Sequence, residues 1–202
     1  RTRNKRSVWF GNRSATRSMF MYDTVRGATY GIPSDEDFDN AAHTNGLLSF
    51  DSDGFTIGNK NNSNGNNETM IAWCWKAGGA PTATNVAGAG NAPTSGSVMI
   101  DGVASTAALA GTQPAKKISA SNKTGLSIVL CDGTGSNMTV AHGLSGAPEM
   151  VWAKSITTGT QNFFVQHKDM QTSGAEVAYL NLDTAGASAT TVWNNTLADS
   201  TV

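Results

Sequence analysis

The acidic residues of this chain are the first place to look for catalytic chemistry. Hydrolysis of a polysaccharide needs two facing carboxyl groups, one protonated and one ionised. A β-strand can supply both as Glu-x-Asp-x-Glu, because side chains two residues apart point to the same face. The 202 residues include only four Glu, and none stands in that pattern. Glu36 lies in the run Asp35-Glu36-Asp37-Phe38-Asp39, which we predict to be a solvated acidic loop. The sequence therefore disfavours a polysaccharide-cleaving glycosidase.

The sequence also lacks the residue patterns that nucleophilic catalysis needs. No Gly-x-Ser-x-Gly elbow occurs, although that motif is what exposes a catalytic serine on a strand-to-helix turn. The three histidines, His43, His142 and His167, lie in different contexts with no Cys or His at ligand spacing. We expect His142, between Ala141 and Gly143, to end a strand and to hydrogen-bond within a turn. The sequence predicts no enzymatic activity.

Calcium is the ion that the sequence suits best. Asp51-Ser52-Asp53-Gly54 offers hard oxygen ligands, which makes Asp51 and Asp53 weak metal candidates. The bidentate Glu that closes a 12-residue calcium loop does not follow at the required position. An Asp-Gly turn explains the same residues, because Asp accepts local backbone hydrogen bonds and Gly takes positive φ. We therefore predict no cofactor, with calcium as the alternative.

Sugar binding would use aromatic rings for stacking and Asn or Asp side chains for the hydroxyl groups. The chain has five Trp. Trp73 and Trp75 share one face of an alternating strand, and Trp9 and Trp152 occupy the same position of a sequence repeat, which predicts core packing for at least four of the five. The polar run 59–67 contains six Asn and is the better candidate for exposed contact with a glycan. The candidate contact residues in it are Asn61, Asn62, Asn64 and Asn66.

Composition favours an all-β protein. The chain has 22 Gly and only 14% charged residues, and its net charge is −1, so nothing favours binding to nucleic acid or an anionic membrane. No stretch approaches the ~20 apolar residues of a membrane span. Cys74 and Cys131 lie in apolar runs, which predicts buried thiols, and a disulfide between them is the alternative.

Short strand signals recur every 8–12 residues or so, as in a β-sandwich or barrel. The clearest is Thr69–Lys76, where Ile71, Trp73 and Trp75 alternate with smaller residues. Further strands are expected at Ser7–Phe10, Ser18–Tyr22, Gly46–Phe50, Gly54–Ile57, Ser97–Val103, Leu126–Cys131, Met138–Ala141, Glu149–Lys154, Asn162–Gln166 and Val177–Leu182.

The sequence repeats itself. Trp9 corresponds to Trp152 and Phe20 to Phe163, each pair 143 residues apart. This period predicts that the chain is a window from a longer protein that begins inside one copy and stops inside the next. Residues 1–78 would be the C-terminal part of one β-sandwich unit and residues 123–202 the N-terminal part of a second. A Gly/Ala/Thr/Pro-rich connection, residues 79–122, would join them and pack over the surface.

Seven blocks of sequence resemble a repeated domain of tail-fibre-like virion proteins of bacteriophages, notably marine ones. These blocks are Asp23–Ala28, Leu48–Gly58, Ile71–Gly79, Gly125–Val129, Thr139–Leu144, Ala147–Glu149 and Val192–Asn194. The resemblance implies a concanavalin-like antiparallel β-sandwich (jelly roll) in each of several tandem units. The family pattern has further strands before Ser7 and after Val202, so each unit here would be incomplete and would leave sheet edges to cover.

The resemblance also implies a function and a location. The protein would be a non-enzymatic virion component on the outside of the particle, in a tail fibre or similar appendage that contributes to host-surface glycan attachment. Its partners would be copies of itself, other virion proteins and host glycans. The alternative is a decoration or cement protein that stabilises the capsid head.

Overall fold

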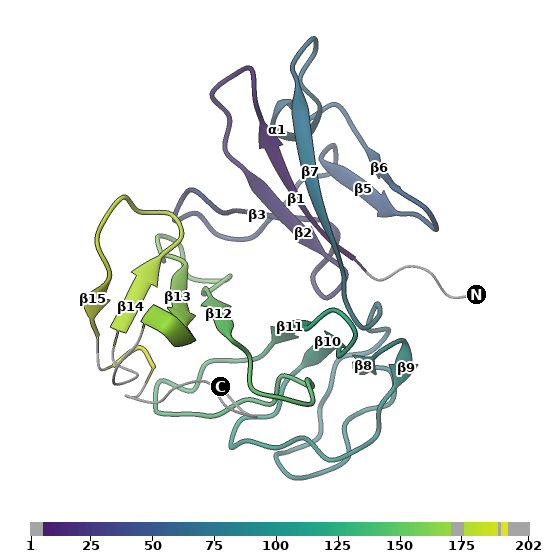
Figure 1. The fold of residues 1–202 in the computed structure, drawn as a ribbon. Coiled ribbons are helices and arrows are strands. Elements are labelled where there is room, and N and C mark those ends of the chain that lie inside the picture. Colours follow the sequence, from purple (N-terminus) through teal and green to yellow (C-terminus); the bar gives the residue numbers. More distant parts are fainter. Residues whose placement is uncertain (1–5, 171–175, 190, 194–202) are drawn as a thin grey trace.

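The computed structural model describes residues 6–170, 176–189 and 191–193. This part of the chain forms short β-strands, joined by turns and loops, with two helical turns, α1 (Asn61–Asn64) and a 3-10 turn at Lys168–Met170. The strands form three main sheets and one hairpin (Figure 1). The predicted all-β, largely antiparallel class is confirmed, and the arrangement is sandwich-like.

The first sheet has five antiparallel strands in the order β4-β3-β2-β1-β7. The strands are β1 (Arg6–Asn12), β2 (Phe20–Asp23), β3 (Gly27–Pro33), β4 (Ala41–Ala42) and β7 (Met70–Lys76). One face of this sheet carries buried Val8 and Phe10, which pack with the hairpin of β5 (Leu47–Phe50) and β6 (Phe55–Ile57). Because side chains alternate along a strand, Trp9 points to the other face.

The second sheet has the order β11-β10-β8-β9. The strands are β8 (Val98–Ile100), β9 (Val103–Ala104), β10 (Lys117–Ser121) and β11 (Leu126–Leu130). Val98, Ile118 and Ala120 are buried in its core with residues of the loop that includes Val140. Residues 98–121, expected to be a surface connection, therefore supply three strands and part of a core. The domain boundaries near 78 and 123 stay a prediction.

The third sheet repeats the order of the first. Its strands, in the order β12-β13-β14-β15, are β12 (Met150–Ala153), β13 (Phe164–His167), β14 (Glu176–Tyr179) and β15 (Ala187–Ser188). Each is antiparallel to the next, as in the run β1-β2-β3-β4. The registers match after a shift of one residue, because Trp9 faces Met21 in β2 and Trp152 faces Val165 in β13, 144 residues after Met21. The sequence period of 143 is thus visible as two similar four-stranded meanders.

Two expectations about strands need correction. The predicted strand at Met138–Ala141 is wrong, because Val140 there makes only an isolated bridge to Gly111. The predicted strand at Ser97–Val103 is divided into β8 and β9 by a tight turn. Asp101 and Gly102 both have positive φ at that turn, so the chain reverses instead of staying extended.

A close backbone approach joins the first sheet to the second. After β7, buried Ala77 and Gly78 cross β10, and the Gly79 N–H donates to the Ser119 hydroxyl at 2.9 Å. A Cβ atom on Gly78 would overlap the backbone oxygens of Met99 and Ala120. Glycine is therefore required at this crossing.

Candidate functional site

Four tryptophans from three strands form one exposed aromatic group, here called the tryptophan cluster. Trp9 lies at its centre, with ring-centroid distances of 5.4 Å to Trp73, 6.3 Å to Trp75 and 6.0 Å to Trp152. Trp73 and Trp75 come from β7, and Trp152 comes from β12 in the third sheet. The cluster therefore joins the two meanders.

The cluster is partly open to solvent, which corrects the expectation that at least four of the five tryptophans pack in a core. Trp73, Trp75 and Trp152 are 40%, 39% and 40% exposed. The physical reason is their position, because β7 and β12 are end strands of their sheets and the β5–β6 hairpin covers only the opposite face of β1. Trp193, by contrast, is buried.

Trp9 is held in place by a hydrogen bond to a buried serine. Its indole Nε1–H donates to the Ser34 hydroxyl at 2.9 Å, and the fully buried Ser34 donates in turn to the Met19 carbonyl at 3.1 Å. Gly11, two residues along β1, leaves room for the Trp73 ring, since a Cβ there would lie 3.1 Å from a Trp73 ring carbon. The central ring is thus fixed while its neighbours remain exposed.

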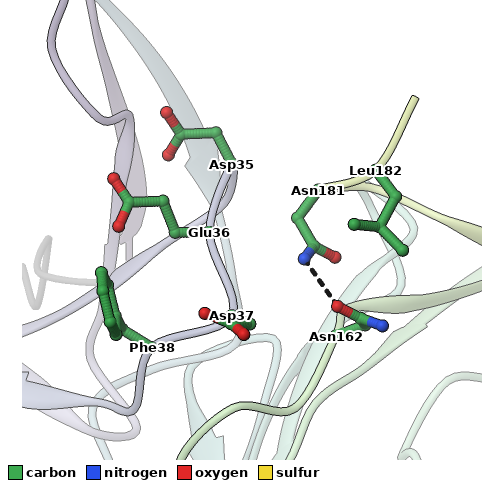
Figure 2. A pocket seen from close by; sticks show the side chains of 7 residues that line it. All are labelled: Asp35, Glu36, Asp37, Phe38, Asn162, Asn181 and Leu182. Carbon is green, nitrogen blue, oxygen red and sulfur yellow. Dashed lines mark hydrogen bonds between the residues drawn. The ribbon is translucent and has the colours of Figure 1, made fainter.

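A polar hollow, here called the acidic pocket, lies next to the cluster. Its volume is about 250 Å³, below the 300–1,000 Å³ typical of drug-sized sites. Figure 2 shows its acidic residues on the β3–β4 segment and its amide side chains on the loops of the third sheet. The lining residues are Asp35, Glu36, Asp37, Phe38, Asn162, Asn181 and Leu182.

The amide wall of the pocket is pre-organised. The Asn181 Nδ2–H donates to Asn162 Oδ1 at 2.9 Å (Figure 2). The Phe163 N–H donates to Asn181 Oδ1, also at 2.9 Å. These bonds fix the orientation of both amide groups. The wall therefore presents hydrogen-bonding groups without first having to order them.

Lys154 connects the pocket walls. Its ammonium group donates to the backbone carbonyls of Glu36 at 3.0 Å and Gln161 at 2.8 Å, and it lies 4.9 Å from the centre of the Phe163 ring. Partial burial lowers the pKa of Lys154, and the carboxylates of Asp37 and Asp39 oppose that shift. Since Lys154 follows Trp152 by two residues and Asp35 follows Ser34, the acidic pocket and the tryptophan cluster lie along the same junction.

The junction offers both kinds of surface that a carbohydrate ligand contacts. Exposed indole rings offer apolar faces, and the nearby carboxylates and amides can accept and donate hydrogen bonds. Within residues 6–170, 176–189 and 191–193, no group of three or more His, Cys, Asp and Glu is placed to hold a metal ion.

The weak calcium candidates lie in the β5–β6 turn. Asp51 accepts hydrogen bonds from the hydroxyl groups of Ser49 at 2.7 Å and Thr56 at 2.8 Å, and its N–H donates to the Gly54 carbonyl. Asp53 accepts from the Ser52 hydroxyl at 3.3 Å. Asp51 thus closes a hairpin turn, and its role as a metal ligand stays a prediction.

The predicted Asn-rich contact loop is held in place by its own side chains. Asn62 donates to the Ser18 carbonyl at 3.1 Å and Asn64 to the Gly58 carbonyl at 2.8 Å. Asn61 and Asn66 are exposed. Glycan contact by this loop stays a prediction, with two of its four amides already used in hydrogen bonds to the backbone.

The histidines and cysteines do not come together. His142 is buried and its Nδ1 accepts the Leu144 N–H at 3.1 Å, so the expected local hydrogen bond is present, but His142 does not end a strand because Val140 makes only an isolated bridge. Cys74 and Cys131 are not joined by a disulfide. Cys74 is exposed on the end strand β7, so the expectation of a buried thiol is wrong there.

Sequence reasoning missed the acidic pocket. Asp35 and Glu36 were assigned to a solvated loop, and Lys154, Asn162 and Asn181 were not singled out. The sequence gives only a partial signal, because Asn162 begins one predicted strand and Asn181 lies inside another. Their meeting depends on how the third sheet sits against the β3–β4 segment, which no local pattern encodes.

Comparison with known sequences places the chain in a family. One family model, described as a domain of unknown function (DUF7483), matches residues 4–100 and again residues 99–202. A search of curated proteins and a search of solved structures found no match. In the part of the chain that the structure describes, no helix is long and apolar enough to span a membrane. Because the two matches together cover nearly the whole sequence, the chain belongs to the DUF7483 family, a domain of unknown function.

Proposed function

We propose that this chain is part of a non-enzymatic structural protein of a bacteriophage particle, in a tail fibre or similar appendage that contributes to host-surface glycan attachment. The observation that carries the proposal is the internal repeat. Two meanders with the same strand order and matching Trp-bearing strands occur in one chain, and one family model matches twice. Repeated small β-modules suit a protein that must extend from a surface and display many copies of one binding face.

In this proposal each meander is part of a concanavalin-like jelly roll in a tandem array. The N-terminal meander supports the idea, since β7 adds to β1 over seven residue pairs from Arg6–Lys76 to Asn12–Met70. The corresponding side of β12 lies at the end of its sheet as described. A complete second unit would place a strand of the β7 type there and so cover the edge.

The adhesive task follows from the exposed side chains. The junction combines open aromatic rings with fixed polar groups, which suits weak contact with carbohydrate. Weak sites gain overall affinity when many copies engage at once, as on a fibre. The chain then needs no bound cofactor and no catalytic residues, and its partners are copies of itself, other virion proteins and host glycans.

Antibodies raised against the purified chain test the proposal on intact particles. Gold-labelled antibody should mark tail appendages in electron micrographs. Regular labelling over the head would instead support a decoration or cement protein. Particles of a phage that encodes the chain and that carry no label at all, under conditions where the antibody detects the chain in lysed particles, would contradict both positions on the outer surface.

A further inference from the structure

We infer that the tryptophan cluster and the acidic pocket form one binding site for neutral sugar units, and that this site rejects acidic polysaccharides. The inference rests on the proposed function and goes further, because it names the site and the chemical class of its ligand. The observation behind it is the exposure of Trp73, Trp75 and Trp152 around a fixed Trp9.

The ring faces supply the apolar half of the site. Trp73 and Trp75 are two residues apart on β7, so their side chains leave the same face of the strand about 7 Å apart. A pyranose ring has an apolar face of C–H groups that can stack on such an indole, and aromatic side chains bury large areas at binding sites. The ~40% exposure of these rings leaves that area available.

The polar half of the site is connected to the rings through residues close to them in the chain. The Trp9 indole binds Ser34, and Asp35 begins the acidic wall. On the other side, Lys154 follows Trp152 by two residues and holds the Glu36 carbonyl. One oxygen each of Asp35 and Glu36 already accepts a hydrogen bond, from the Met19 N–H and the Ser18 hydroxyl, so their second oxygens are the acceptors left for sugar hydroxyl groups. The Asn162 and Asn181 amides offer donors and acceptors in fixed directions.

The charge of this wall selects among sugars. Asp35, Glu36 and Asp37 line the pocket together, and the nearby Lys154 ammonium already donates to two backbone carbonyls. A uronic or sialic acid would bring a carboxylate against like charges, which disfavours its binding. A neutral hexose polymer meets no such repulsion.

Affinity electrophoresis of the purified chain in gels that contain one polysaccharide each tests the inference. The neutral probes are dextran, laminarin and yeast mannan, and the acidic probes are alginate and polygalacturonate. The chain should be retarded by at least one neutral probe and by neither acidic probe. Retardation by no neutral probe, or by the acidic probes alone, would overturn the inference.

Variants locate the binding. Trp75→Ala and Trp152→Ala should each weaken retardation about fivefold to tenfold, as for aromatic anchors of other interfaces. Leu48→Ala is the matched control, because Leu48 is 41% exposed but lies on β5, in the hairpin that covers the opposite face of the first sheet. Circular dichroism must show that each variant is folded. The inference fails if the Trp variants bind as the unaltered chain does.

Two further measurements test whether the acidic wall excludes acidic sugars and whether the tryptophan cluster is instead a protein interface. Asp35→Asn combined with Glu36→Gln should allow retardation by alginate, whereas unchanged exclusion would refute the role of the acidic wall. Sedimentation should give the same mass for the unaltered chain and Trp75→Ala. A loss of self-association in Trp75→Ala, without a change in sugar retardation, would make the cluster a protein interface and overturn the inference.

Binding to whole host cells distinguishes failure of this site from failure of the proposed function. If the unaltered chain and Trp75→Ala adhere to cells equally, the site is wrong but the adhesive function stands. If the unaltered chain does not adhere to cells at all, the proposed function is wrong, whatever the polysaccharide gels show.

Discussion

Trp9 and Trp152 occupy matching positions in two β-meanders, and their rings meet edge to face with centroids 6.0 Å apart and planes inclined at 77°. They do not lie in two separate cores, as the repeat alone suggests. The equivalent strands β1 and β12 instead bring their tryptophans to a shared junction. The repeat therefore creates the candidate site, since each copy supplies part of it.

The Trp9–Trp152 contact should be measurable as a coupling energy. Trp9→Ala and Trp152→Ala, made singly and together, should show non-additive losses in the free energy of unfolding, with a coupling of about 0.5–1.5 kcal/mol. Urea denaturation of the four proteins gives this value. Strict additivity would mean that the two rings do not interact in solution.

The buried ion pair between Asp23 and Arg26 should matter far more than a surface pair. Its atoms are 2.6 Å apart and both side chains are about nine-tenths buried. Arg26→Met leaves the Asp23 carboxylate buried without its cation, which should lower the free energy of unfolding by about 3–5 kcal/mol. Denaturant titration measures the loss.

Lys116 provides the matched control for Arg26. It lies 2.7 Å from Asp132, but these side chains are 40% and 61% exposed. Lys116→Met should therefore cost only about 0–1 kcal/mol, as is usual for exposed pairs. Equal losses of unfolding free energy in Arg26→Met and Lys116→Met would show that burial does not strengthen the Asp23–Arg26 ion pair.

The sequence predicts strands where large side chains alternate. It does not reveal them where the side chains are small or polar. β7 was clear from Ile71, Trp73 and Trp75. In contrast, β10 reads Lys-Ile-Ser-Ala-Ser, and its serines are buried where Ser119 accepts the Gly79 N–H and Ser121 donates to Asp101. β3 contains two Gly and a Pro, which conceal its extended conformation.

The candidate site was predictable only in its parts. The repeat correctly paired Trp9 with Trp152, but period-two alternation cannot tell a core face from an exposed one. That distinction depends on which face the β5–β6 hairpin covers and on β7 and β12 being end strands. The acidic pocket depends on contacts between residues more than 100 positions apart, such as Lys154 with Glu36.

Gly78 should not tolerate a side chain. In Gly78→Ala the added methyl group would collide with backbone oxygens of Met99 and Ala120, neither of which is the end of a flexible side chain. Overpacking of this kind should destabilise the protein by about 1–3 kcal/mol, measured by thermal or urea unfolding. Gly146→Ala is the control, because nothing lies within 4 Å of a Cβ at Gly146. An unchanged free energy of unfolding in Gly78→Ala would show that the backbones of Gly78, Met99 and Ala120 lie farther apart than described.

The Tyr22 hydroxyl should ionise only at an unusually high pH. Burial raises the pKa of its hydroxyl to about 12, and the neighbouring Leu47 backbone and Arg26 charge offset only part of this shift. Among the described residues, the Tyr22 hydroxyl has no well-aligned hydrogen-bond partner. Ultraviolet titration of the folded chain should show a tyrosinate step near pH 12 that Tyr22→Phe removes.

The same shift predicts how stability depends on pH. A folded-state pKa above the unfolded value of about 10 means that the unfolded chain releases the Tyr22 proton first. The contribution of Tyr22 to the free energy of unfolding is therefore fully present below about pH 10 and is lost as the pH rises towards 12. Tyr22→Phe should flatten the decline in unfolding free energy over this range. An unchanged slope would contradict the burial of the hydroxyl.

Competition for adsorption tests the central claim most directly. Host cells are incubated with the purified chain before phage particles that carry it are added, and free particles are counted over time. The account predicts slower adsorption with the unaltered chain, and little slowing with Trp75→Ala at the same concentration. Adsorption at the normal rate under a saturating excess of the unaltered chain would contradict a role in host attachment.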